Sequence, residues 1–145
     1  MSLSFNVYLR GDTVYAPALA KIDVGHFMEV EPVGMAPVSD EAAVSETIRR
    51  AFAAGNPPVA HPTRGNWPKS VLLKYAGCKT WMQFQRRARL WSVEQDGNLW
   101  RVTPNRVRPD GRGLEEDTEA AIHWTGLSAA EAACRMAGLV AGAAR

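Results

Sequence analysis

A β-hairpin in residues 90–103 constrains the fold more than any other feature of the sequence. Apolar and polar residues alternate on both sides of Asp96-Gly97, a dipeptide favoured in the two-residue turns that join antiparallel strands. Successive side chains of a strand point to opposite faces, so each arm of the hairpin has one apolar face to bury. The hairpin therefore predicts an antiparallel sheet with a second layer packed on one side.

The register of the hairpin follows from its turn. With the Asp-Gly dipeptide as the loop, Val93 is expected opposite Trp100. Two residues further from the turn, Trp91 is expected opposite Val102. The four side chains then share the core face of the sheet, where aromatic and β-branched pairs stabilise neighbouring strands.

The same alternation predicts four further strands, at residues 5–9, 14–22, 27–33 and 120–124. Gly25 marks the turn between the second and the third of these strands. Glu29 and Glu31 alternate with apolar residues, which predicts a half-exposed strand. Pro32 and Pro37 either place that strand at a sheet edge or end it early. Residues 56–68 contain four prolines and are expected to form a loop, whereas residues 70–75 fit either a short strand or a helical turn.

Three segments have the start signals of helices and apolar residues at helical spacing. Asp40 is a helix N-cap, and Thr80 with Gln83 and Ser128 with Glu131 have the spacing of capping boxes. The predicted helices are residues 40–55, 80–89 and 128–140. Because the strands cluster, the sequence predicts one α+β domain over residues 1–145, with an antiparallel sheet of about five to seven strands and three helices. The predicted core consists of Trp91, Val93, Trp100, Val102, Ile122, Trp124, Phe84, Ile48 and Phe52.

The charge of the chain is unevenly distributed. The net charge is only +2, but residues 64–112 contain eleven basic and three acidic side chains. Such an asymmetry suits nucleic acid, an acidic partner, or pairing with the acidic ends of the same chain. The basic candidates for a nucleic-acid surface are Arg86, Arg87, Arg89, Arg101, Arg106 and Arg108.

No catalytic motif accompanies this charge pattern. A nucleophile elbow, a P-loop and a dinucleotide-binding glycine motif are absent from the sequence. The three histidines and two cysteines do not have the spacing of metal ligands. We therefore expect no enzymatic activity, no metal and no cofactor. The sequence shows neither a secretory signal nor a membrane span, so a cytoplasmic location with reduced thiols is expected.

The densest acidic cluster precedes the last predicted strand, and it consists of Glu115, Glu116, Asp117 and Glu119. Such a cluster either keeps a loop soluble or meets a basic protein partner, whose association it accelerates. We take these four residues as the candidate partner-binding site.

Part of the chain resembles a known family. Leu72–Phe84, Leu90–Glu94, Trp100–Pro104 and Arg108–Gly111 together resemble the immunity proteins of bacterial contact-dependent growth inhibition systems, over roughly residues 66–124. This resemblance implies a cytoplasmic, non-catalytic protein that binds the C-terminal toxin domain of a delivered effector. The toxins of such systems are often nucleases. The alternatives are a nucleic-acid-binding module using the basic region 64–112 and, third, a small enzyme without a recognised motif.

Overall fold

The computed structural model describes residues 2–23, 26–63, 65 and 67–145. Gly25, expected at a turn, and Arg64, at the start of the basic region, lie outside the described residues. Over the described ranges the chain forms an α+β fold with an antiparallel seven-stranded sheet, as predicted. Its strands are β1 (Ser2–Arg10), β2 (Thr13–Asp23), β3 (His26–Pro37), β4 (Ala88–Asp96), β5 (Leu99–Val107), β6 (Leu114–Glu116) and β7 (Ile122–Thr125).

The sheet has the strand order β3-β2-β1-β4-β5-β6, and β7 pairs with β5 beside β6. The proline-containing β3 lies at one edge, as the sequence predicts. The described helices are α1 (Glu41–Ala54), α2 (Leu72–Ala76), α3 (Trp81–Gln85) and α4 (Ala129–Ala144), with a 3-10 turn, η1 (Thr118–Ala120). The three predicted helices correspond to α1, α3 and α4, and α2 shows that residues 70–75 take the helical alternative.

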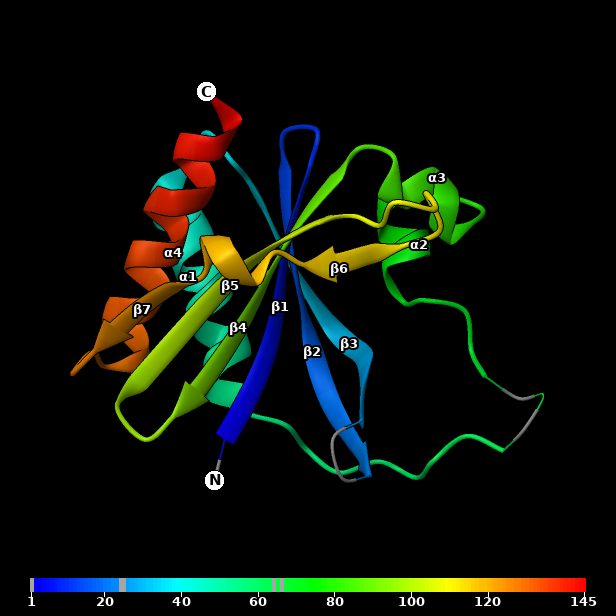
Figure 1. Cartoon of the computed structure of the whole chain (residues 1–145), viewed down its shortest axis with the longest axis horizontal. Coiled ribbons are helices and arrows are strands. Elements are labelled where there is room, and N and C mark those ends of the chain that lie inside the picture. The colour runs from blue at the N-terminus through cyan, green and yellow to red at the C-terminus, as the bar shows by residue number, and fades with distance from the viewer. Residues whose placement is uncertain (1, 24–25, 64, 66) are drawn as a thin grey trace.

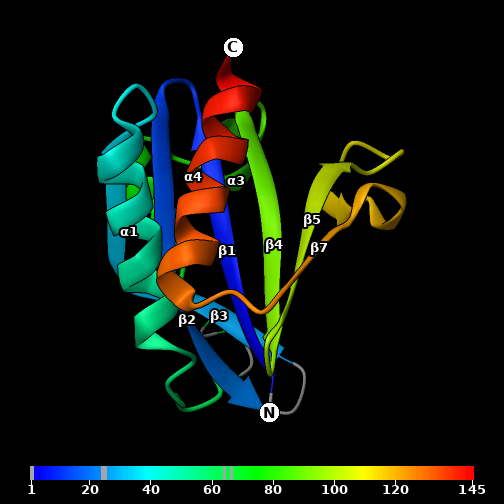
Figure 2. The same cartoon turned by 90° about the vertical axis from the view of Figure 1, so that its left-hand side faces the viewer.

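The two long helices cover one face of the sheet. Figure 2 shows α1 and α4 side by side along that face. The short helices α2 and α3 lie on the other face, at one end of the sheet (Figure 1). Much of this second face is therefore free of helices, and we call it the open face.

The predicted core is largely confirmed. Trp91, Val93, Trp100 and Val102 are buried under α1 and α4. The other buried members are Ile48, Phe52 and Phe84. Ile122 and Trp124 are only half-buried, because β7 lies at the outer side of β5, but both pack against the same core. Phe84 belongs to a second, smaller core beneath α2 and α3, where its ring contacts Tyr8 and Tyr15 edge-on.

The hairpin register differs from the prediction by two residues. Val93 pairs with Val102, and Trp100 pairs with Gln95, because the turn consists of Gly97 and Asn98. Gly97 has a φ of +61°, whereas no non-glycine residue in the described chain has a positive φ. A glycine at the first turn position suits a type II′ turn, whereas an Asp-Gly type I′ turn would require positive φ at Asp96 as well. A shift of two residues keeps every side chain on its predicted face.

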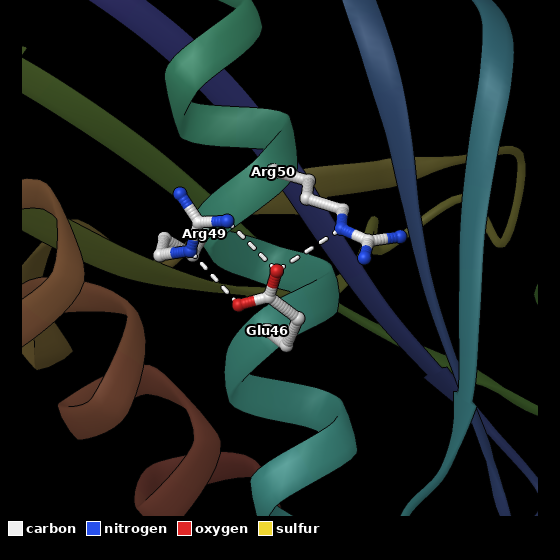
Figure 3. A network of polar contacts seen from close by, with 3 residues as sticks. All are labelled: Glu46, Arg49 and Arg50. Carbon is white, nitrogen blue, oxygen red and sulfur yellow. Dashed lines mark hydrogen bonds and ion pairs between the residues drawn. The ribbon is translucent and has the colours of Figure 1, made fainter.

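Helix α1 is held by its cap and by surface ion pairs. Asp40 accepts a hydrogen bond from the backbone of Ala43, as expected. Glu46 binds Arg49 and Arg50, which lie one turn further along the helix (Figure 3). Its hydrogen bonds with Arg49 and Arg50 lower the pKa of Glu46 to about 2. The helix also approaches β3 closely, since a methyl group on Gly34 would lie 2.6 Å from Cγ2 of Thr47.

The other two predicted caps differ in outcome. Ser128 and Glu131 form the complete capping box of α4. Thr80 caps the backbone of Gln83, but the Gln83 side chain accepts from the backbone of Lys79 instead of that of Thr80. Helix α3 also ends at Gln85, three residues before β4 begins, so the predicted basic helix over 80–89 is too long.

Candidate functional site

The open face of the sheet contains a cavity of about 620 Å³. It lies where β1 and β2 separate. The two strands pair only at residues 8–10 of β1, beside the turn that joins them, and diverge toward the start of β1 (Figure 1). Its floor comes from β1, β2, β3 and β4, and one wall comes from the proline-rich segment before α2. The lining residues used below are Asn6, Tyr8, Phe27, Glu29, Trp67, Lys69, Glu94 and Glu116.

Asn56 occupies the gap between the diverging strands. Its Oδ1 accepts a hydrogen bond from the backbone of Ser4, and its Nδ2 donates to the carbonyls of Ser4 and Leu19. The following residues pair with Lys21 of β2, whose backbone bonds to Pro57 and Val59. The segment after α1 thus replaces β1 as the neighbour of β2. This replacement satisfies the backbone groups that the divergence would otherwise leave unpaired.

Glu29 of β3 reaches across β2 to two side chains of β1. Its Oε2 accepts hydrogen bonds from the hydroxyl of Tyr8 at 2.6 Å and from Nδ2 of Asn6 at 2.9 Å. Oε1 has no hydrogen-bond partner within the described residues, and Glu29 lines the cavity. The sequence predicts a half-exposed strand here, and Glu29 is indeed half-buried. The divergence of β1 and β2, which the sequence does not predict, places its carboxylate at a cavity.

Burial is the main electrostatic influence on this pair. Desolvation raises the pKa of Glu29, although the hydrogen bonds from Tyr8 and Asn6 act in the opposite direction. Burial also raises the pKa of Tyr8 well above 10.0, and the nearby Glu29 carboxylate adds to that shift. The ionised form of Glu29 is therefore disfavoured in the folded protein. No Lys or Arg in the described chain forms an ion pair with it.

Trp67 lies on the cavity wall in the proline-rich segment. It is 53% exposed, the only tryptophan among the exposed large hydrophobic residues of the described chain. His61 contacts its ring edge-on at a centroid distance of 5.4 Å. The sequence pattern places the other four tryptophans on core faces, and Trp67 is the one tryptophan that this pattern does not explain. Its exposure beside a polar cavity makes it a candidate contact residue.

A second cavity of about 700 Å³ adjoins the first, on the α2 side. The two cavities share Met28, Glu29 and residues 68–70. Next to Glu29 on β3, Glu31 binds Nζ of Lys74 at 2.6 Å and the hydroxyl of Tyr75, and these contacts join β3 to α2. The hydrogen bonds from Lys74 and Tyr75 lower the pKa of Glu31. The two glutamates of β3 thus differ, because Glu31 forms an ion pair with Lys74 whereas Glu29 forms none with a described residue.

The four acidic residues predicted to bind a partner lie together in β6 and η1. Glu115 forms an ion pair with Arg106 at 3.2 Å, and Asp117 is anchored through its backbone to Pro104. Glu116 and Glu119 are exposed. Glu116 also lines the first cavity, so the predicted acidic surface and the cavity are contiguous.

The six basic candidates are spread over both faces of the sheet. Arg101 pairs with Glu94 on the open face at 2.8 Å, and Arg108 lies 3.7 Å from Asp110. Arg89 projects from the opposite face, where Nη1 donates to the carbonyl of Ala143. Arg106 binds an acidic residue as described above, and the remaining two, Arg86 and Arg87, are exposed after α3.

The remaining polar candidates are not assembled into a site. No group of three His, Cys, Asp or Glu side chains in the described ranges is arranged to hold a metal ion. Cys78 follows α2 and is half-buried, and Cys134 is exposed on α4. None of the helices in the described chain is long and apolar enough to cross a membrane.

Solved structures with the same fold provide a comparison. One is a protein of unknown function from Neisseria meningitidis, which matches with a TM-score of 0.70 and 10% identity over 100% of this chain and 96% of the other. Another is the CdiA-CT/CdiI toxin and immunity complex from Yersinia pseudotuberculosis, with a TM-score of 0.58 and 11% identity over 97% of each chain. The sequence itself matches no family model and no curated protein. The protein thus has the fold of a chain in a toxin and immunity complex, in agreement with the resemblance of residues 66–124.

Proposed function

We propose that this protein is an immunity protein that binds and neutralises the toxin domain of a contact-dependent growth inhibition system. The observation that carries the proposal is the fold match to a chain of a toxin and immunity complex along 97% of both chains. The resemblance of residues 66–124 to immunity proteins supports the same function. The protein acts without catalysis, in the cytoplasm, where a delivered toxin would meet its targets.

The test is protection of cells from the cognate toxin. The C-terminal domain encoded by the gene immediately upstream is expressed in a susceptible strain, with and without this protein. We expect growth to be restored by co-expression, and the two purified proteins to form a complex. A large effector gene upstream whose toxin domain kills equally well in the presence of this protein would contradict the proposal.

We further propose that the toxin is a nuclease and that it binds the acidic surface of Glu115, Glu116, Asp117 and Glu119. A nuclease active site is a basic cleft built for phosphate, so rigidly held carboxylates complement it. These carboxylates lie in β6 and η1. The segment is held in place by the ion pair of Glu115 with Arg106 and by the backbone hydrogen bond of Asp117 to Pro104.

This surface is tested by reversing the charge of Glu115, Glu116 and Asp117 together, with folding checked by circular dichroism. We expect loss of protection and weaker toxin binding. The control reverses three exposed acidic residues elsewhere, Asp12, Glu41 and Asp96, so that the net charge changes equally. If the first variant binds as tightly as the parent, the surface is wrong, and the exposed Arg86 and Arg87 become the next candidates.

A further inference from the structure

The carboxylate of Glu29 has the features of an incomplete ion pair. One oxygen is occupied by Tyr8 and Asn6, whereas the other has no partner within the described residues. Glu29 is half-buried, and a carboxylate that has lost part of its hydration normally gains a cation or further hydrogen bonds to compensate. The two donors are neutral, so the negative charge of Glu29 is uncompensated in the free protein.

The surroundings of Glu29 favour a cation. Three carboxylates line the cavity, those of Glu29, Glu94 and Glu116, and Glu94 is already neutralised by Arg101. Lys69 is the one lining lysine, and it is exposed and unpaired with Glu29.

Aromatic rings complete the lining. Tyr8, Phe27 and Trp67 contribute to the same cavity as the carboxylates. Aromatic faces attract organic cations, and tryptophan does so most strongly. Carboxylates combined with aromatic rings therefore suit a lysine or arginine side chain better than an anion or an apolar group.

We propose that the first cavity, where β1 and β2 diverge, receives a basic side chain of the toxin, which forms a buried ion pair with Glu29. This inference rests on the proposed immunity function, and it adds the chemistry of the contact. A protein side chain is favoured over a free small cation because Glu116 belongs both to the cavity and to the proposed acidic contact surface. A toxin seated on that surface would thus lie at the mouth of the cavity, beside the exposed Trp67.

The first experiment measures toxin binding by the Glu29→Gln variant, which keeps the shape of the side chain and removes its charge. Loss of one partner of a buried charge pair weakens binding by about 30-fold or more. The matched control is Glu94→Gln, in the same cavity, where Arg101 already neutralises the carboxylate. We expect at most about a threefold change there, as for an exposed ion pair.

The two proposals fail in distinguishable ways. If the parent protein protects cells and Glu29→Gln binds the toxin as tightly as the parent, the inference about the cavity is wrong while the immunity function stands. If the parent does not protect, the immunity function is wrong.

The cavity is then tested without a toxin, by titrating the full chain with argininamide or lysinamide and following the backbone amide signals by NMR. Shifts that are confined to the cavity strands and to the residues around Trp67, and that are lost in Glu29→Gln, support a cation site. If Glu29→Gln binds the toxin as tightly as the parent, the same shifts identify a small cation as the ligand and overturn the proposal of a toxin side chain. Shifts that are absent, or that are equal in both proteins, overturn the inference.

Discussion

At the residue scale, Glu29 links stability to pH. Its pKa is raised from 4.5 in the folded protein, so the folded state holds a proton that the unfolded state has already released. The free energy of unfolding therefore falls as the pH rises from about 4.5 through the raised pKa, and stays lower above it.

The Glu29→Gln variant lacks this loss. We expect its free energy of unfolding to increase relative to the parent between about pH 4 and about pH 8, as measured by urea denaturation. Glu31, Glu46 and Glu131, whose pKa values are lowered, are common to both proteins and cancel in the comparison. Parallel pH profiles of the two proteins would show that Glu29 is ionised without penalty. A buried charge that reduces stability at neutral pH is typical of a functional site.

Asn56 is the second residue whose side chain shapes the cavity. Asn56→Ala would leave the backbone groups of Ser4 and Leu19 without their partners, so we expect a loss of about 1–3 kcal/mol in the free energy of unfolding. Asn56→Asp keeps the acceptor for Ser4 but loses every hydrogen bond that Nδ2 donates, and is also expected to destabilise. A loss below about 0.5 kcal/mol for Asn56→Ala would mean that water replaces the side chain.

At the scale of elements, local sequence signals predict six of the seven strands and the long helices, but neither β6, which lies in a segment that reads as a loop, nor the relations between strands. The faces of the hairpin follow from alternation, which survives a shift of two residues, whereas the register depends on which residues form the turn. The cavity depends on the divergence of β1 and β2 and on Asn56, which is 37 residues from Leu19 in sequence. No local pattern marks such a contact. The sequence features that point to the cavity are Trp67, which the core pattern does not explain, and the two glutamates of β3.

The packing of α1 against β3 yields a prediction at the same scale. In Gly34→Ala the new methyl group would meet Cγ2 of Thr47 at 2.6 Å, so the Thr47 side chain, the helix or the edge strand must shift. We expect a loss of about 1–3 kcal/mol in stability, the usual range for an overpacked contact. Thr47→Ser removes the methyl group that clashes, so the double variant should recover part of that loss. Additive effects in this double-mutant cycle would locate the strain elsewhere.

At the scale of the whole molecule, folding separates charges that the sequence groups together. The basic middle of the chain is distributed over both faces of the sheet, and several of its side chains are paired with carboxylates. Arg101 binds Glu94, Arg106 binds Glu115, and Lys74 binds Glu31. The acidic β6–η1 segment, by contrast, adjoins the cavity of the open face through Glu116. This arrangement supports a protein partner over a nucleic acid.

The nucleic-acid alternative makes a different prediction for salt dependence. Each phosphate contact contributes about −0.9 to the slope of log K against log salt concentration for duplex DNA. With Arg86 and Arg87 as the exposed, unpaired pair of the six candidates, we expect weak binding to a generic duplex and a slope of about −2. Replacing both by glutamine should abolish that slope, whereas glutamine at Arg101 and Arg106 should change it little. A slope near −5, reduced by either double variant, would instead show that the ion pairs open and that the six arginines contact phosphate together.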